Sequence, residues 1–466
     1  MTVAVYFFSR DLRLYDNTGL ASIAKKNGKI IPMFVLTPEQ IDRKRNPYFS
    51  ENCAQFMYES LVDLDVSLKD LGRSLGIFYG THVGCLAALK KTIEFQEAHI
   101  MNDVTPYSVA RSNTIREWCC KNGVAFHEHD DVDLLTMDQG LRNQTKPYQV
   151  FAPYFRHVTE DCTVRPVTTL KLQAIHFASD RSSKSFSSLD CLRATFRPNE
   201  FLAVHGGRSE ALKRLKFVNS LNDYKVNRDF PSLDKSTSLL SAYIKFGCVS
   251  IREVYWKAVK KFGKTHAFVR ELWFRSFYYH IAKYNPHILQ GRPFKLNYEA
   301  ISWRNDEAGF RRWCRGLTGI PLCDAGMRNL VATGHLHNRV RMVVASVLCK
   351  LLLIDWRRGE KFMASLLLDF DPVSNNCGWQ TMASTAPPFS EQYDRTMNPF
   401  RQAQRYDKDA IYIKRWIPEL RDVPAKAILN WETAHNDYQV NYPPPIVDVK
   451  KARQRAKDVF KKVTKS

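Results

Sequence analysis

The sequence lacks an apolar run long enough to cross a bilayer. The longest such run, Met342–Trp356, is interrupted by Lys350 and Asp355, whereas a spanning helix needs about 20 predominantly apolar residues. The N-terminus also lacks a basic leader and a small-residue cleavage site, so its short apolar run is expected to be a strand. These absences predict a soluble intracellular protein, cytoplasmic or nuclear, that does not contact a membrane.

Cysteine and glycine are not arranged in the patterns that specify common sites. The 11 cysteines are an odd number without CxxC spacing, which excludes a disulfide framework and zinc knuckles and indicates a reducing compartment. His335 and His337 would point to different sides of a helix, so no metal is predicted. No GxGxxG follows the first expected strand, which argues against dinucleotide binding in the Rossmann manner.

Acidic residues are too few to balance the basic ones. The chain has 69 Lys and Arg against 47 Asp and Glu, a net charge of +22. Residues 1–220 carry a surplus of only 4 positive charges, and residues 221–466 carry the other 18. A surplus of this size is typical of proteins that bind a polyanion, so nucleic acid is expected on the C-terminal half. A basic surface kept for solubility is the alternative.

The hydrophobic pattern changes along the chain. Short apolar runs alternate with helical stretches in the N-terminal part, which predicts a five-stranded parallel α/β sheet. The expected strands are 2–9, 29–37, 73–81, 98–104 and 123–135. Beyond residue 221, apolar residues recur at helical spacing over 250–262, 266–284, 307–316, 324–333, 335–353 and 359–368. We therefore predict an α/β domain (1–135), a long linker (136–220) and an all-α domain (221–466).

Three polar motifs in the helical half carry candidate chemistry. Hydroxyl residues in Asp234–Ser241 precede an apolar helix, an arrangement that can bind phosphate but more often only caps the helix. Glu271 lies on one helical face with Phe274, Arg275 and Tyr278, where it could hydrogen-bond a flat base; a Glu271–Arg275 surface pair is the alternative. Burying Arg341 unpaired would be costly, so it is expected to meet an aspartate such as Asp369 or Asp371.

Aromatic and basic residues suggest two further roles. Trp303, Trp356 and Trp379 fall in separate helical segments; a core role is the ordinary reading of each, and electron transfer needs distances that a sequence does not give. Phosphate contacts beside stacking surfaces are predicted for basic residues interleaved with aromatic ones. These residues are Arg228, Arg339, Arg395 and Arg401.

The ordered motifs of the chain resemble those of the photolyase/cryptochrome family over nearly the whole length. The segment Asn338–Met342 most resembles the class I photolyases that repair cyclobutane pyrimidine dimers. The motifs that carry the resemblance are Val5–Asn17, Arg228–Pro231, Thr237–Ser241, Gly319–Arg328, Gly334–Met342, Leu353–Glu360 and Asn375–Gln380.

The resemblance implies a folded FAD inside the helical domain. Arg341 and Asp369 would form an ion pair beside the flavin ring, and Asp371 would contact its other edge. Asn375 would face the flavin N5 and favour the reduced, negatively charged form. The residues expected to bind FAD are Tyr224, Thr237, Ser238, Leu239, Leu240, Ser241, Arg275, Asn338, Arg341, Asp369, Phe370, Asp371 and Asn375.

The resemblance also implies light-driven repair of damaged DNA by a monomer. Excited reduced flavin would give an electron to a dimer turned out of the duplex, a step that costs a few kcal/mol in unstacking. Glu271 and Met342 would touch the lesion, and Trp379, Trp356 and Trp303 would relay electrons from flavin to surface. The expected catalytic residues are Glu271, Met342, Asn375, Arg341 and Asp369; those expected to lie near DNA are Arg228, Glu271, Phe274, Tyr278, Asn338, Arg339, Arg395 and Gln402.

Some positions depart from the family pattern. Phe274 and Thr381 stand where many class I photolyases have two tryptophans that hold the dimer. Thr105 and Gln290 replace the acidic and basic residues of folate-binding relatives, which disfavours folate as a second, antenna chromophore and leaves deazaflavin, another flavin or none. A cryptochrome-like photoreceptor without repair activity is the alternative function. Repair of six-four photoproducts is disfavoured, because Asn338 and Arg339 stand where that branch has a histidine pair.

Overall fold

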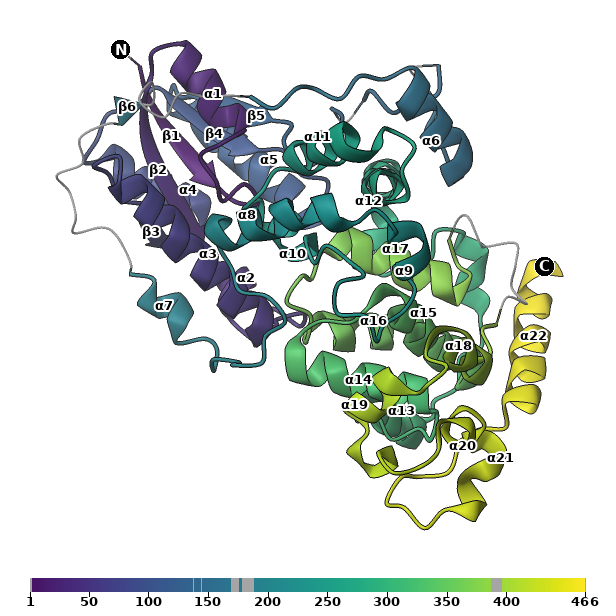
Figure 1. Ribbon diagram of the computed structural model, residues 1–466. Coiled ribbons are helices and arrows are strands. Elements are labelled where there is room, and N and C mark those ends of the chain that lie inside the picture. The colour runs from purple at the N-terminus through teal and green to yellow at the C-terminus, as the bar shows by residue number, and fades with distance from the viewer. Residues whose placement is uncertain are drawn as a thin grey trace.

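A computed structural model of the chain describes residues 2–136, 138–143, 145–168, 176–177, 188–386 and 396–465. A parallel sheet with helices on both faces forms the N-terminal part, and the rest is helical (Figure 1). The predicted combination of an α/β and an all-α part is therefore confirmed. Within the described ranges, no helix is both long and apolar enough to span a membrane.

The sheet contains all five predicted strands. They are β1 (Val3–Phe8), β2 (Lys29–Leu36), β3 (Gly76–Tyr79), β4 (Glu97–Met101) and β5 (Ala125–His129). The order is β3-β2-β1-β4-β5, and every pairing is parallel. A sixth strand, β6 (His176–Phe177), pairs with β2. The sequence did not predict it, because two residues are too few to show a period.

The two faces of the sheet bury different clusters. Val5 and Phe7 of β1 pack with the apolar residues of α4 (His82–Lys90) and α5 (Pro106–Lys121). Tyr6 and Phe8 point to the other face, toward α1 (Thr18–Lys25) and α3 (Glu51–Lys69). That second cluster continues into the helical half through Tyr243, so the sheet and the helices share one core.

The segment 136–220, predicted as a linker, contains regular elements besides β6. They are α6 (Phe151–Glu160), α7 (Asp190–Arg193) and α8 (Arg208–Phe217). Arg208 donates to Glu253 at 2.9 Å and so ties α8 to a helix of the C-terminal half. Within this segment, α6 packs on α12 and α7 packs on α3 (Figure 1). Most of its Ser-rich part, 181–189, lies outside the described residues.

The C-terminal half is built from short and medium helices. Its helices are α9 (Tyr224–Asn227), α10 (Ser241–Phe246), α11 (Ile251–Phe262), α12 (Ala267–Tyr284), α13 (Glu307–Cys314), α14 (Pro321–Thr333), α15 (Asn338–Ser346), α16 (Trp356–Ala364), α17 (Pro372–Ala383), α18 (Pro399–Tyr406), α19 (Ile411–Trp416), α20 (Ala425–Leu429), α21 (Trp431–Ala434) and α22 (Val449–Lys465). A π-helical turn, Val347–Leu351, follows α15, and α2 (Pro38–Ile41) lies in the N-terminal half. The six predicted helical segments each correspond to observed helices.

One predicted helix start, at His335, was wrong. It begins at Asn338, because the ring of His337 accepts the backbone N–H of Arg339 at 3.2 Å and caps the helix. By contrast, the predicted start at Ser250 is close to the observed one. Ser250 and Glu253 form a capping box at the start of α11. His335 and His337 therefore both precede α15, so the prediction that they point to different sides of one helix is wrong.

A buried ionic network joins the two halves. Asp131, which follows β5, pairs with Arg13 and with Arg252 of α11, and the three side chains are about 1% exposed. Arg252 also lies 3.0 Å from Asp16, whose carboxylate accepts the Ser250 hydroxyl. Burial alone would raise the pKa of Asp131, but the two guanidinium groups hold it below its usual value. The network fixes the sheet against α11.

Candidate functional site

The helical half contains a cavity of about 290 Å³, near the lower end of the range for small-molecule and cofactor sites. We call it the helical cavity. It lies between α9, α10, α12, α15 and α17. Its lining residues are Tyr224, Thr237, Ser238, Leu239, Leu240, Ser241, Ile244, Lys245, Arg275, His335, Leu336, His337, Asn338, Arg341, Leu367, Asp369, Asp371, Ser374 and Asn375. Twelve residues predicted to bind FAD are among them.

One wall of the helical cavity is the loop that leads into α10. Leu239 has φ +54°, a conformation that residues with a Cβ rarely adopt. Such backbone strain is typical of functional sites. The Ser238 hydroxyl accepts the backbone N–H of Leu240 at 3.3 Å, and no side chain caps α10 itself. The run Thr237–Ser241 therefore lines the cavity with hydroxyls at the start of a helix.

The opposite wall carries an ion pair and an amide. Arg341 Nη2 lies 3.7 Å from Asp369 Oδ1, which confirms that Arg341 meets an aspartate. Asn375 sits one turn into α17 and donates to the backbone oxygen of Glu360 at 3.5 Å. Neither Asp369 Oδ1 nor Asn375 Oδ1 has a hydrogen-bond partner among the described residues, although both atoms are buried. Both oxygens can therefore accept a hydrogen bond from a polar ligand, Asp369 Oδ1 beside its ion pair with Arg341.

Asp371 ties the cavity to the sheet. It caps α17 by accepting the backbone N–H of Ser374 at 2.9 Å, and it accepts the Tyr279 hydroxyl at 2.6 Å. Arg10, just after β1, forms an ion pair with the same carboxylate. Burial acts to raise the pKa of Asp371, but Arg10 and Arg275 hold it well below its usual range. Asp371 is therefore an anion at neutral pH.

The helical cavity fits a large cofactor with both flat and anionic parts. Arg275 Nη2 is buried and lacks a hydrogen-bond partner among the described residues, as do the two oxygens of Asp369 and Asn375. Leaving such groups unpaired costs about 1–3 kcal/mol each. A ligand that accepts from a guanidinium and donates to an amide oxygen would satisfy them. FAD carries a diphosphate and a ring with N–H groups, so these residues suit it.

Of the predicted lesion and DNA residues that the structure describes, Asn338 lines the helical cavity and the others do not. Glu271 pairs with Arg228, whose guanidinium covers the Tyr224 ring at 5.7 Å. The alternative Glu271–Arg275 surface pair is therefore wrong, because Arg275 turns inward and donates to the backbone oxygen of Val132 at 2.8 Å.

Other members of this group lie on α12, α15 and α18. Arg339 pairs with Asp229 at 2.9 Å and lies near the sulfur of Met342, 4.0 Å away. Phe274 packs on Phe151 with ring centroids 4.2 Å apart. Gln402 Oε1 is buried without a partner among the described residues. Thr381 is buried on α17, and Arg395 lies outside the described residues.

Of the three predicted relay tryptophans, Trp379 and Trp356 are buried and Trp303 is partly exposed. Trp379 is buried one turn after Asn375, and its ring lies against α16, where a Cβ on Gly359 would come within 2.3 Å of it. Trp356 is buried at the start of α16, and Trp303 is partly exposed beside Phe460 of α22, with ring centroids 6.0 Å apart. The Trp379 ring also contacts Trp313, at 6.2 Å.

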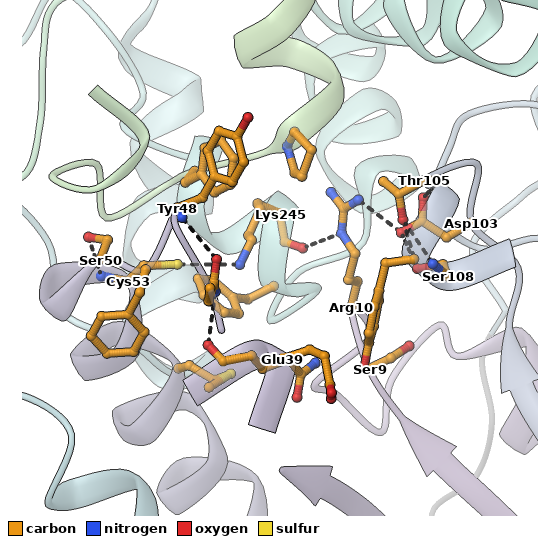
Figure 2. Close-up of a pocket in the computed structure, with 18 of the residues that line it drawn as sticks. Ser9, Arg10, Glu39, Tyr48, Ser50, Cys53, Asp103, Thr105, Ser108 and Lys245 are labelled. Atoms are coloured by element: carbon orange, nitrogen blue, oxygen red, sulfur yellow. Dashed lines mark hydrogen bonds and ion pairs between the residues drawn. The ribbon is translucent and has the colours of Figure 1, made fainter. Parts of the chain in front are cut away.

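A second cavity, of about 230 Å³, opens at the carboxyl ends of β1 and β4. We call it the switch-point cavity, because the chain leaves neighbouring strands of a parallel sheet in opposite directions there, which is where ligands of such sheets bind. It is shown in Figure 2. Its lining residues are Ser9, Arg10, Phe34, Glu39, Gln40, Asn46, Tyr48, Phe49, Ser50, Cys53, Ala54, Met57, Asp103, Thr105, Tyr107, Ser108, Arg111, Lys245, Phe246, Phe370 and Pro372.

Polar residues divide the two cavities. Lys245 lines both, and its backbone oxygen accepts from Arg10 Nε at 3.1 Å (Figure 2). Arg10 also contacts Asp103 at 3.2 Å. Phe370, predicted to bind FAD, lines the switch-point cavity instead, where it stacks on Tyr48 at 5.8 Å. The sequence analysis missed Arg10 and Lys245 because their positions depend on contacts between residues 235 apart.

Comparisons with known proteins agree with this arrangement. A family model described as DNA photolyase matches residues 4–173, and one described as the FAD binding domain of DNA photolyase matches residues 268–462. The chain is 33% identical to the deoxyribodipyrimidine photo-lyase of Alkalihalophilus pseudofirmus, over 98% of this chain and 97% of that one. It is 31% identical to the Halobacterium salinarum photo-lyase, over 98% of each.

Solved structures show the same likeness. An archaeal photolyase from Sulfolobus tokodaii, described with two FAD molecules, has a TM-score of 0.87 at 34% identity and covers 99% of this chain and 100% of its own. A class III photolyase from Agrobacterium tumefaciens scores 0.90 at 28% identity (100% and 98% covered), and a Synechocystis cryptochrome 0.88 at 26% (98% and 99%). This chain therefore belongs to the photolyase/cryptochrome family and is a DNA photolyase with an FAD-binding domain.

Proposed function

We propose that the protein repairs cyclobutane pyrimidine dimers in DNA in a light-driven reaction, with FAD in the helical cavity. The observation that supports this most directly is the cavity itself, which gathers Thr237–Ser241, the Arg341–Asp369 pair and Asn375 around buried polar atoms that need a ligand. Bound reduced flavin supplies an electron to the dimer on illumination. The residues of the chain hold, orient and shield the reactants.

Separate parts of the helical cavity hold separate parts of the cofactor. The hydroxyls and backbone of Thr237–Ser241 bind the diphosphate, as phosphates bind at the start of a helix. Arg341 and Asp369 lie beside the flavin ring, and Asn375 directs its buried amide oxygen to the ring edge. Asp371 lines the same cavity and would contact the other edge of the ring; its bonds to Arg10 and Tyr279 also fix α17 and thereby Asn375.

The surface next to the helical cavity binds the lesion and its strand. Glu271 and Arg228 form an ion pair about one-third exposed, so the carboxylate can exchange its guanidinium partner for the edge of a pyrimidine. Phe274 and Tyr278 offer flat faces for stacking, with ring centroids 5.3 Å apart. Arg339 and Asn338 at the start of α15 contact backbone phosphate, which positions the strand without reading its sequence.

Illumination of the purified protein with an oligonucleotide that contains a dimer is expected to restore the two pyrimidines, and the dark control is expected to restore none. Chromatography of the oligonucleotide measures the product. Glu271→Ala should lower the repair yield about tenfold, the loss expected for one hydrogen bond to a charged group, without emptying the flavin site. Flavin binding without repair in the light would favour the cryptochrome-like photoreceptor. Thr381 favours the same alternative, because it stands where many class I photolyases have a tryptophan that holds the dimer.

We propose further that the switch-point cavity binds a second chromophore that carries phosphate. Arg111 of α5 lines this cavity, and its buried Nε and Nη2 atoms have no partner among the described residues. The S. tokodaii relative, described with two FAD molecules and a light-harvesting cofactor, supports a flavin nucleotide. Thr105 lines the cavity and caps α5, so it offers no carboxylate to folate.

Arg111→Gln is expected to weaken the binding of this second chromophore about tenfold or more, because a charge-assisted hydrogen bond to phosphate is lost. Chromatography of the chromophores released on denaturation counts those bound per chain. Arg116→Gln is a matched control on the same helix, since Arg116 is exposed and pairs with Glu128. Equal occupancy in both variants would contradict the assignment, and the helical cavity should keep its FAD in either case.

A further inference from the structure

A carboxylate and three imidazoles meet on one face of the sheet, at its β4–β5 edge. Strand β4 carries Glu97 and His99, and the edge strand β5 carries His127 and His129. In the parallel register, His99 is opposite His127, and alternate residues of a strand share a face. The four side chains therefore lie together, on the side of the sheet where Lys26 follows the end of α1.

The distances among these side chains suit a metal ion. Glu97 Oε2 lies 2.8 Å from His99 Nε2 and 3.9 Å from His127 Nε2. One ligand atom from each of the three residues lies within 4.8 Å of the others. Two ligands of a tetrahedral Zn²⁺ ion are about 3.3 Å apart, given bonds of about 2.0–2.1 Å. The observed separations bracket this value, so small side-chain movements bring all three atoms to one ion.

The surroundings prepare His99 as a ligand. Its ring is fully buried, and its Nδ1 lies 2.9 Å from His129 Nε2. Without an ion, His99 Nε2–H donates to Glu97 Oε2 at 2.8 Å; an ion that replaces this proton leaves the ring proton on Nδ1, where it is donated to His129, the arrangement that outer hydrogen bonds impose on metal-binding histidines.

We propose that Glu97, His99 and His127 bind a divalent transition-metal ion of the Zn²⁺ class. Two imidazole nitrogens and one carboxylate oxygen form a donor set that such ions prefer, and that Ca²⁺ and Mg²⁺ do not. The His127 side chain is 37% exposed, which gives the ion a path and leaves its fourth position to water. The bound ion cross-links the edge strand β5 to β4 and stabilises the sheet.

Zn²⁺ binding to the full-length, flavin-loaded protein tests the site. Equilibrium dialysis after treatment with chelator is expected to find one saturable Zn²⁺ per chain, with a thermal midpoint that rises with Zn²⁺. His127→Ala and Glu97→Gln should each weaken binding about tenfold or more and abolish the thermal shift. Lys26→Met should tighten it, because Lys26 Nζ lies 3.3 Å from Glu97 Oε1 and repels the ion. These variants alter partly exposed side chains and leave the buried His99 intact.

His205→Ala is the matched control, because His205 forms a single exposed pair with Glu59 at 3.2 Å. It should leave the Zn²⁺ affinity unchanged. The proposal is overturned if the wild-type protein shows no saturable site, or if His127→Ala and Glu97→Gln bind Zn²⁺ as tightly as wild type. In the second outcome the ion would be held elsewhere, for example by cysteines. None of these results depends on repair activity.

Discussion

Replacing Asp131 by alanine is expected to lower the free energy of unfolding by about 3–5 kcal/mol, because two buried guanidinium groups lose their counterion. Arg13 and Arg252 are both about 1% exposed, so water cannot replace the carboxylate. Only Arg252 keeps a second acidic partner, Asp16 at 3.0 Å. Chemical denaturation of the flavin-loaded protein, followed by tryptophan fluorescence, measures the loss.

Asp138→Ala provides the control for this experiment. Asp138 pairs with Lys283 but is 82% exposed, and an exposed ion pair contributes about 0–1 kcal/mol. Equal losses in the two variants would show that the buried network does not stabilise the protein. Asp131→Asn keeps the shape of the side chain but removes its charge. If the charge is what stabilises the protein, this variant should lose nearly as much free energy of unfolding as Asp131→Ala.

The same network makes stability depend on pH. The pKa of Asp131 is lower in the folded protein than in the unfolded chain, where it is about 3.9. Its contribution is therefore fully present above that value and is lost as the pH falls through the lower folded pKa. As the pH falls below about 5, the free energy of unfolding should decrease more in wild type than in Asp131→Asn. Parallel curves of this free energy against pH for the two proteins would contradict the prediction.

Trp379→Phe is expected to slow photoreduction of oxidised, bound flavin about tenfold or more, while repair by chemically pre-reduced enzyme stays near wild type. Trp379 is a buried member of the predicted relay, one turn from Asn375 and against α16, which begins at Trp356. Phenylalanine keeps an aromatic ring in the core, but it is much harder to oxidise than tryptophan. Absorption spectra during illumination give the rate.

Trp416→Phe on α19 is the matched tryptophan control and should leave photoreduction unchanged. An unchanged rate in Trp379→Phe would remove that residue from the relay. A rate that falls equally in Trp313→Phe would show that the ring 6.2 Å from Trp379 carries electrons as well. Loss of repair by the pre-reduced Trp379→Phe enzyme would instead indicate damage to the flavin site.

Sequence reasoning found the elements and the motif residues but not the contacts across the chain. The runs of apolar and β-branched residues were enough for the strands β1 to β4, because most of their residues are buried, whereas the edge strand β5 is only partly buried. Thr237–Ser241, Arg341 and Asn375 were predicted because they lie in contiguous motifs. By contrast, the role of Arg10 depends on packing against Lys245 and Asp371, which no local pattern encodes.

The edge of the sheet shows the same limit. Glu97 and His99 alternate along one strand and His127 and His129 along another, so the pattern of each strand was visible. Their meeting depends on the register of β4 against β5, which only the fold supplies. A shift of one residue would turn one pair to the opposite face. From the sequence alone, His335 and His337 were weighed as a metal-binding pair instead, because they are neighbours in the chain.

The contact between Arg10 and Asp371 has a consequence for biosynthesis. Residues near the N-terminus leave the ribosome first, and domains generally fold in that order. The guanidinium of Arg10 is then already presented at the end of β1 when α17 emerges, and the helix that carries Asn375 and Trp379 is completed against it. A fragment translated without its first strand would leave the Asp371 carboxylate without its Arg10 partner. The cofactor pocket of this enzyme is thus finished only by a part of the chain made several hundred codons earlier.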